Sequence, residues 1–448
     1  MMKTRSKVMF IYIFIFFSSL VLSDRIKSDS RNFNEDIGMP NISSGGLAYR
    51  RWGGPNPDVA HAITIDSSDN LYLAGYTESY GALGRDVCVV KYDKSGTVQW
   101  HKTYGTSDDD EAYAITVDSY GNIYVAGYTQ IGYNYCIYLL KLNSSGDLKW
   151  DKTWEGDYMS KAFAIALDSQ NNIYLGGYKN TDMCLVKFNN SGDIKWYSVP
   201  INQTPTYDSG NGIAIDSSDN IYLVGDVGFD SDICLLKYNT SGGILMFQIW
   251  DPPRINDIDL GGGIVLDPFN NIYIAGTTWN YETFSYEICL LKYNNLSEYQ
   301  GYSTWDGVPW EEYQYTEDRA TGITMDSSGN IFICGYTYSE DPTGKNYDAL
   351  LLKFNSTGDF EWSQTWGGEK HDYGYGITLD SQDNIYICGE TSSFAEVDND
   401  IDMCVIIYQQ SQQSQLIYGY NLFISLGFLG ITTVLIIIVS RKFKKERR

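Results

Sequence analysis

The chain is poor in basic residues and in histidine. Lys and Arg total 32 of its 448 residues against 56 Asp and Glu, the net charge is -24, and only 3 residues are His. Proteins that bind the phosphate backbone of a nucleic acid need a basic patch, so this balance excludes that class of partner. Three scattered His are too few to build a His-ligated metal enzyme. With 43% hydrophobic residues the chain can form a large core, which excludes a disordered polymer.

Recognised catalytic motifs are absent as well. The sequence contains no GxSxG, HExxH, P-loop or GxGxxG, and its eight Cys include no CxxC pair. Those motifs mark serine nucleophiles, zinc peptidases, phosphate cradles, dinucleotide sites and structural zinc. We therefore expect a protein that is not an enzyme and holds no resident cofactor.

Charged residues are also missing from a long apolar segment near the C-terminus. Residues 416–440 carry none and precede the basic residues 441–448. A bilayer core needs ~20 apolar residues, and a following basic cluster places the C-terminus in the cytoplasm. The segment predicts a single transmembrane helix after a spacer at residues 409–415. With Gly419-Tyr420-Asn421-Leu422 before the apolar run, this tail resembles archaeal surface-sorting tails.

The N-terminus predicts export. Residues 1–23 combine basic residues, an apolar run and a small-residue cleavage site, which is typical of a secretory signal peptide. An uncleaved anchor is the alternative. Residues 24–45 then form a linker. We expect a cell-membrane protein with an extracellular domain and a cytoplasmic C-terminus.

A ten-residue signature recurs seven times through the middle of the chain. It begins as DSSDNLYLAG at Asp66 and returns, with small changes, at Asp118, Asp168, Asp216, Asp267, Asp326 and Asp380. Repeats of this period indicate a propeller or a solenoid. Each unit carries four strand signals, named A to D here. Strand A precedes the signature Asp, strand B is the Asn-Ile-Tyr run, strand C resembles CVVKY, and strand D ends in Trp.

The ends of the repeat array predict a closed ring. The last strand C, residues 402–408, has no strand D after it, whereas an orphan strand D at residues 47–52 precedes the first strand A. If the orphan pairs with the last strand C, no sheet edge of the array stays open. A solenoid needs distinct caps instead. We predict an all-β, seven-bladed β-propeller of four-stranded antiparallel blades over residues 46–408.

These motifs resemble the SBBP-type β-propeller repeat family. The resemblance rests on D-S-x-x-N-I-Y-x-x-G, on D-x-C-L-L-K-Y-N-x-S-G and on a following Trp and Thr-Trp-Gly. It implies a propeller of four-stranded blades and no single activity. Residues 294–305 lack the Ser-Gly turn, which puts the outer strand of the fifth blade in doubt. The spacing of Gly96 and Trp100 is also similar to the docking motif of quinoprotein propellers.

Repeated Trp and Cys positions are best explained by packing. Gly96 and Trp100 recur at the same spacing in three further units, which favours a Trp side chain lying against the glycine backbone of a neighbouring blade. Five Cys share one strand C position in different blades, beyond the reach of a disulfide. We expect them to be small buried residues. His61 occupies a strand A position that holds Tyr113 and Phe163 in the next units, which also favours packing.

The variable links predict a binding face. B–C links differ in length between units, whereas A–B links do not, and B–C and D–A links leave a blade on the same side. Two of these links are rich in aromatic residues beside acids, which suits carbohydrate or protein recognition. The alternative is that they pack on each other. The candidate binding residues are Trp279, Tyr281, Tyr286, Trp310, Tyr313 and Tyr315.

Two sets of acids lie on the same side. One set opens strand A in six units: Asp58, Asp110, Asp208, Asp259, Asp318 and Asp372. The other opens strand C: Asp86, Asp182, Asp232, Glu287, Asp348 and Asp402. Each acid can fix a loop by accepting backbone hydrogen bonds. The alternative is that the strand A set holds a cation near the axis, with Ca²⁺ as the candidate.

These observations favour a non-enzymatic binding module. We expect the protein to bind an extracellular protein or glycan through its B–C/D–A face, and to contact the membrane through its C-terminal helix. Two alternatives remain open. One is an exported propeller enzyme, either a quinone-dependent dehydrogenase or a glycan hydrolase or lyase. The other is a structural component of the cell envelope.

Overall fold

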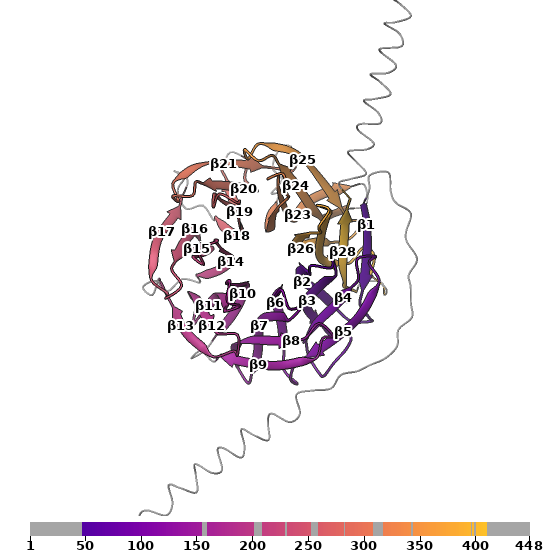
Figure 1. The fold of residues 1–448 in the computed structure, drawn as a ribbon. Coiled ribbons are helices and arrows are strands. Elements are labelled where there is room, and N and C mark those ends of the chain that lie inside the picture. Colours follow the sequence, from indigo (N-terminus) through magenta and orange to yellow (C-terminus); the bar gives the residue numbers. More distant parts are fainter. Residues whose placement is uncertain are drawn as a thin grey trace, which may run out of the picture.

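The computed structural model of the chain describes residues 47–154, 159–200, 208–228, 231–251, 259–281, 283–307, 317–341, 344–395, 397 and 400–409. All regular elements in these ranges are β-strands, and they form seven four-stranded antiparallel sheets around a central axis (Figure 1). The predicted seven-bladed β-propeller is confirmed. Within this part of the chain there is no helix with the length and apolarity that a membrane crossing requires.

Four predicted segments lie wholly or almost wholly outside the described residues. They are the signal peptide (1–23), the linker (24–45), the transmembrane segment (416–440) and the basic tail (441–448), and of the spacer (409–415) only residue 409 is described.

Each blade uses four strands, A to D from the axis outwards. Blades 1 to 3 consist of β2 (Asp58–Ile65), β3 (Leu71–Thr77), β4 (Asp86–Tyr92), β5 (Val98–Tyr104), β6 (Asp110–Val117), β7 (Ile123–Ile131), β8 (Asn134–Leu142), β9 (Leu148–Trp154), β10 (Ser160–Leu167), β11 (Ile173–Lys179), β12 (Asp182–Phe188) and β13 (Ile194–Ser198). Blades 4 and 5 consist of β14 (Ser209–Ile215), β15 (Ile221–Val227), β16 (Asp232–Tyr238), β17 (Ile244–Trp250), β18 (Leu260–Leu266), β19 (Ile272–Asn280), β20 (Ser285–Tyr293) and β21 (Tyr299–Trp305). Blades 6 and 7 consist of β22 (Arg319–Met325), β23 (Ile331–Asp341), β24 (Gly344–Phe354), β25 (Phe360–Trp366), β26 (Asp372–Leu379), β27 (Ile385–Thr391), β28 (Asp402–Tyr408) and β1 (Leu47–Trp52).

The first strand of the described chain closes the ring. β1 pairs antiparallel with β28, from Leu47 opposite Tyr408 to Trp52 opposite Met403, and so supplies strand D of blade 7. Figure 1 shows the indigo β1 beside the yellow β28 in this blade. The predicted closure is confirmed, and it removes the two open sheet edges that a linear array would expose.

The signature sequence forms the A–B turn. In blade 1, the Asp66 carboxylate accepts hydrogen bonds from the main-chain N–H groups of Ser68 and Asn70, and the Asn70 side chain also donates to it. Asp69 takes the left-handed conformation with φ 60°. A short polar side chain tolerates that conformation and a β-branched one does not, which explains the composition of the turn.

The hydrophobic core lies between blades. Trp100 of blade 1 packs against Gly146 of blade 2, where an added Cβ would lie 3.1 Å from the indole ring. Gly192 meets Trp150 at 3.1 Å in the same way. The predicted packing of Trp on a neighbouring glycine is confirmed at these boundaries. All eight Cys are free and buried, as the repeat positions predicted.

Blade 5 has the outer strand that its sequence put in doubt. β21 pairs with β20 from Ile288 opposite Trp305 to Tyr293 opposite Tyr299. The turn before it uses Asn294, whose side chain accepts hydrogen bonds from the N–H groups of Leu296 and Glu298. Ser297 takes a left-handed φ of 63°, at the position where glycine has a φ of 79° to 91° in other blades. The missing Ser-Gly pair is therefore compensated by the Asx turn.

Candidate functional site

The B–C and D–A links gather at one end of the ring, as predicted. In blade 1, the N–H of Glu78 after strand B donates to the carbonyl of Pro57 in the D–A link, at 2.9 Å. The Gln130 N–H makes the same bond to Asp109 in blade 2, and Ser392 makes it to His371 in blade 7. We call this end the B–C/D–A face.

The B–C links differ strongly in length. They range from residues 132–133 between β7 and β8 to residues 392–401 between β27 and β28. Several carry an exposed apolar side chain at or near the tip, and Tyr133 is fully exposed. These exposed residues are Leu83, Ile131, Tyr133, Tyr281, Phe284 and Val397.

The predicted aromatic residues of blade 5 are only partly available on this face. Tyr281 is exposed, but Tyr286 is buried under the Arg319 guanidinium, which lies 4.1 Å from the centre of its ring. Trp279 packs edge-on against Tyr286 with ring centres 4.8 Å apart. Sequence reasoning missed the exposed Phe284 beside them. The other three predicted residues, Trp310, Tyr313 and Tyr315, lie outside the described residues.

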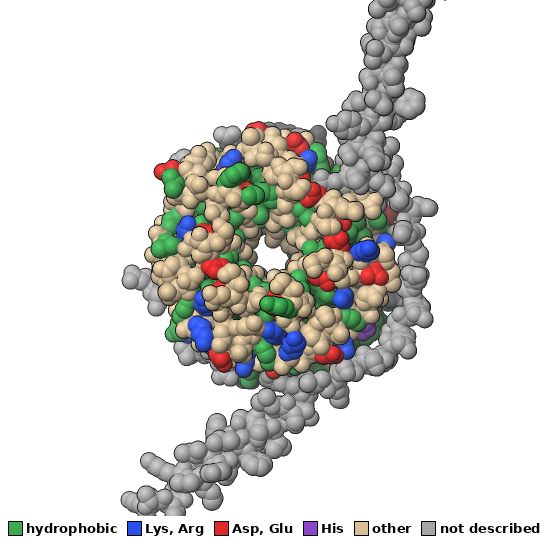
Figure 2. All heavy atoms as spheres, viewed as in Figure 1, with side chains coloured by type: hydrophobic (Ala, Val, Ile, Leu, Met, Phe, Trp, Pro, Cys, Tyr) green, Lys and Arg blue, Asp and Glu red, His purple; other side chains and the backbone are tan. Residues whose placement is uncertain are grey.

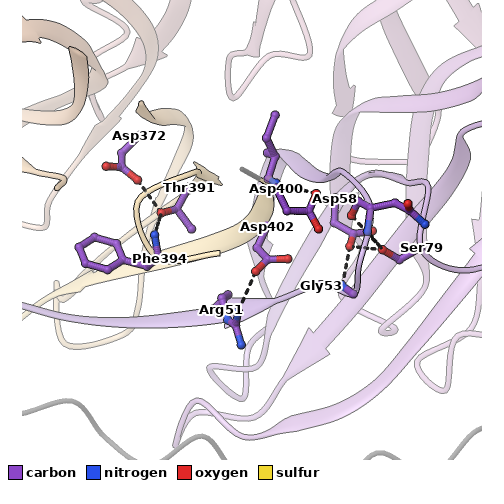
Figure 3. Close-up of polar contacts among 12 residues, drawn as sticks. Arg51, Gly53, Asp58, Ser79, Asp372, Thr391, Phe394, Asp400 and Asp402 are labelled. Atoms are coloured by element: carbon purple, nitrogen blue, oxygen red, sulfur yellow. Dashed lines mark hydrogen bonds and ion pairs between the residues drawn. The ribbon is translucent and has the colours of Figure 1, made fainter. Parts of the chain in front are cut away.

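The six predicted strand A aspartates are buried at separate blade boundaries. Each lies at the start of strand A or directly before it, and each is almost fully inaccessible: Asp58, Asp110, Asp208, Asp259, Asp318 and Asp372. Asp58 accepts hydrogen bonds from the Gly54 N–H at 2.8 Å and the Ser79 hydroxyl at 2.8 Å (Figure 3). In blade 7, Asp372 accepts from the Gly368 N–H at 2.9 Å. Such bonds hold the D–A link against the strands, as the loop-fixing interpretation predicted.

The two acid sets meet across the blade boundaries. The N–H of Asp110 in blade 2 donates to the carbonyl of Arg85, the residue before Asp86 in blade 1, at 2.7 Å. Gly105 lies between the two side chains, because a Cβ there would be 2.2 Å from an Asp86 oxygen and 2.7 Å from an Asp110 oxygen. Burial raises the pKa of Asp86 to about 7, and the charge of Asp110 adds to the shift.

The same arrangement recurs where the ring closes. The N–H of Asp58 donates to the carbonyl of Ile401, the residue before Asp402, at 2.8 Å. Gly53 lies between the two carboxylates, as Gly105 does in blade 1. Burial raises the pKa of Asp58 to about 6, with a smaller contribution from Asp402. In the described ranges, no three or more His, Cys, Asp or Glu side chains are grouped so as to hold a metal ion.

A second set of side chains lines the axis of the ring. Every strand A has a β-bulge, and in blade 1 the register shifts between Ala60 and Ala62, so that His61 has no partner in strand B. The bulge residues of the seven blades, from blade 1 to blade 7, are His61, Tyr113, Phe163, Asn211, Gly262, Thr321 and Tyr375. A bulge leaves one residue outside the ladder and turns its side chain.

The bulge side chains reach to the next blade. Asn211 donates from its side chain to the carbonyl of Gly261 in blade 5 at 3.0 Å, and Thr321 donates to Gly374 in blade 7 at 2.9 Å. His61 stacks on Tyr113 of blade 2 with ring centres 4.7 Å apart. These residues therefore form the inner wall around the hole that Figure 2 shows at the centre of the ring.

Four aromatic bulge residues form one continuous arc. Ring centres are 5.4 Å apart for Tyr375 and His61, 4.7 Å for His61 and Tyr113, and 5.2 Å for Tyr113 and Phe163. We call these four residues the aromatic crescent. All four are partly exposed. The sequence shows the repeated position, but not the bulge that places it on the axis.

Charged groups border the crescent. Glu111 accepts a hydrogen bond from the Tyr113 hydroxyl at 2.5 Å and pairs with Arg85 at 2.5 Å. The Lys161 ammonium lies 3.8 Å from the centre of the Tyr128 ring. Burial lowers the pKa of His61 to about 4, so its imidazole is neutral at neutral pH. Its Nε2 is buried and has no hydrogen-bond partner among the described residues.

Comparisons with known proteins agree with this fold. The family model described as an SBBP β-propeller repeat matches residues 50–81, 99–134, 313–341 and 361–394. A β-propeller domain of unknown function (DUF5122) matches residues 121–148. No curated protein matches the chain.

Solved structures resemble the chain at low sequence identity. An ulvan lyase of polysaccharide lyase family PL25 has 12% identity and a TM-score of 0.50, covering 79% of this chain and 93% of that one. The periplasmic gluconolactonase PpgL of Pseudomonas aeruginosa has 9% identity and a TM-score of 0.48, covering 70% and 87%. The Pan2 WD40 domain of Neurospora crassa has 10% identity and a TM-score of 0.46, covering 83% and 98%.

The identity to the lyase is too low to carry over its activity, so that likeness shows the fold alone. The repeat matches, the seven signatures and the closed ring agree with one another. The chain is therefore a seven-bladed β-propeller, and four of its segments match the SBBP β-propeller repeat.

Proposed function

We propose that this protein is a non-enzymatic binding module at the cell surface, exported and held in the membrane by its C-terminal segment. Its B–C/D–A face recognises an extracellular protein or glycan. The acidic charge of the chain disfavours nucleic acid as a partner.

One observation carries the proposal. The links that differ between blades lie together on the B–C/D–A face and present exposed apolar tips such as Tyr133 and Phe284. The A–B turns at the opposite end keep one geometry around the signature Asp. A rigid scaffold that varies only in the loops of one face is the usual arrangement of a recognition surface.

Exposed residues at both ends of the ring allow a matched test. The face variant replaces Tyr133, Tyr281 and Phe284 with Ser. The control variant replaces three equally apolar, exposed residues of the opposite turns, Tyr120, Phe269 and Leu296, with Ser. The full chain is screened for binding to arrays of glycans and of extracellular proteins.

We expect the face variant to lose at least about tenfold in affinity for the ligands that the wild type binds, because exposed aromatic side chains dominate such contacts. The control variant should retain them. Equal losses in both variants, or loss in the control alone, would contradict the proposal.

A second candidate, an exported glycan hydrolase or lyase, is favoured by one cluster. Neutral His61 lies beside Tyr113, whose hydroxyl donates to Glu111, and Arg85 pairs with that carboxylate. A neutral imidazole, a carboxylate and a guanidinium are groups that acid–base catalysis uses. Release of new reducing ends or unsaturated products from a glycan, abolished in His61→Gln, would favour this candidate over a binding module.

A further inference from the structure

We propose that the aromatic crescent on the inner wall is a subsite for a neutral oligosaccharide, with one pyranose ring stacked against Tyr113 and Phe163. This inference rests on the proposed function and places its ligand. The oligosaccharide enters the axial hole from the B–C/D–A face.

The asymmetry of the wall is the first argument. Packing between blades does not require aromatic bulge residues, because blades 4 and 6 close the same wall with Asn211 and Thr321. Blade 5 has Gly262, where an added Cβ would lie 2.8 Å from the Ala320 carbonyl oxygen. Four adjacent blades nevertheless place aromatic rings on the axis.

The position of the crescent is the second argument. His61 lies three residues after Asp58, which marks the B–C/D–A end of strand A. Three residues of strand span roughly 10 Å, so the rings lie within reach of a chain that enters from that face. The rings are partly exposed, and the blades leave an open hole at the centre of the ring (Figure 2). Flat apolar surface left in contact with water is stabilised when a ligand covers it.

The polar neighbours of the rings decide the class of ligand. The Tyr113 hydroxyl bonds to Glu111, and the buried Nε2 of the neutral His61 ring has no hydrogen-bond partner among the described residues. Aromatic faces bordered by hydrogen-bonding groups match a sugar, which offers C–H groups on its faces and hydroxyl groups at its edges.

Charge favours a neutral sugar over other flat ligands. Arg85 pairs with Glu78 at 3.0 Å and with Glu111, and the Lys161 ammonium is the second cation nearby, so the charges of these four groups balance beside the rings. Lys161 already lies over Tyr128, which disfavours a cationic ligand at that side of the crescent. The net charge of -24 opposes nucleotides and other phosphates.

The bulge residues of other blades provide substitutions for the crescent, because the inner wall already contains those residues at the equivalent position. Phe163→Asn introduces the residue that blade 4 has at this position, and Tyr375→Thr introduces the residue of blade 6. Thr321→Asn is the control, because it changes the wall outside the crescent. Each full-length protein is purified in a detergent without a sugar headgroup. It is then titrated calorimetrically with maltohexaose, cellohexaose, mannohexaose and chitohexaose.

We expect at least one of these oligosaccharides to bind the wild type. Phe163→Asn should weaken that binding by about tenfold, because it removes one stacking surface. Thr321→Asn should leave the dissociation constant unchanged. Equal binding by the wild type and Phe163→Asn overturns the inference.

Hydrogen exchange of the wild type gives a readout that does not depend on variant folding. With bound oligosaccharide, residues 60–63, 112–115 and 162–165 should gain protection, and residues 210–213 and 261–264 should not. Protection confined to the B–C tips overturns the crescent subsite and leaves the proposed function standing. Binding of tetramethylammonium or a nucleoside at the crescent, without binding of any of the four sugars, overturns the assigned ligand class.

Discussion

Arg51 of the first strand pairs with Asp402 of the last, with Nη1 and Oδ2 2.9 Å apart (Figure 3). In the register of the two strands, Arg51 lies opposite Cys404 of strand C. The residue opposite the equivalent strand C position is Thr in blades 1, 2, 5 and 6, and it is Arg only in the closing blade. Asp402 is fully buried, and Arg51 is 15% exposed. An ion pair thus links the strand that closes the ring to its neighbour.

Replacing Arg51 by Thr tests the role of this pair. The variant leaves the buried Asp402 carboxylate without its guanidinium partner, so we expect the free energy of unfolding to fall by about 3 kcal/mol. Amide exchange of residues 47–52 should rise more than that of β5, the matching strand of blade 1. Chemical denaturation and hydrogen exchange measure the two effects.

Arg50→Thr is the matched control for the closure. The Arg50 guanidinium donates to the carbonyl of its own neighbour, Tyr49, so its removal strands no buried charge. If both variants lose equal stability, or if exchange in residues 47–52 stays unchanged in Arg51→Thr, the ion pair does not hold the ring closed.

Acidification from pH 7.5 to pH 5 should stabilise the propeller. Burial raises the pKa of Asp58 to about 6 and those of Asp86 and Asp318 to about 7, whereas unfolded Asp titrates near 3.8. Between these values the native state binds more protons than the unfolded state, so stability is lost as pH rises through the native pKa values. His61, whose pKa is lowered to about 4, opposes this effect below pH 6.5.

The expected net gain on acidification is about 4 kcal/mol in the free energy of unfolding. Urea denaturation across the pH range measures it. Asp86→Asn keeps an acceptor for the Ala82 N–H but does not titrate, so the variant should be more stable than the wild type at pH 7.5 and less pH-dependent. A wild-type stability that falls steadily below pH 7.5 would show that these carboxyls do not control the response.

Calcium should leave the melting temperature unchanged. The strand A aspartates occupy separate blade boundaries, and those of blades 1 and 7 accept hydrogen bonds from the D–A link. A ligand at 100 times its dissociation constant adds about 2.7 kcal/mol, which thermal unfolding detects readily. A saturable rise with Ca²⁺, with Mg²⁺ as the control and lost in Asp110→Asn, would instead support a cation site.

The sequence shows the residues of both side-chain sets as repeated positions, but it does not show the contacts between them. The acids that open strands A and C are visible as repeats, but their pairing joins Asp86 of one blade to Asp110 of the next. The repeated position of His61, Tyr113 and Phe163 is equally visible, and it indicated packing. Neither pattern predicts which side chains contact each other. The positions of residues within one repeat do not determine which residues of the neighbouring blade lie beside them.

By itself the amino-acid sequence determined the number of blades, the A–B turns and the closure by residues 47–52, because these depend on local turn chemistry and on counting strands. Only the tertiary structure decided that the acids pair at blade boundaries and that four aromatic residues line the axis. A β-bulge and the rotation from blade to blade set those contacts, and both arise from the packing of whole sheets.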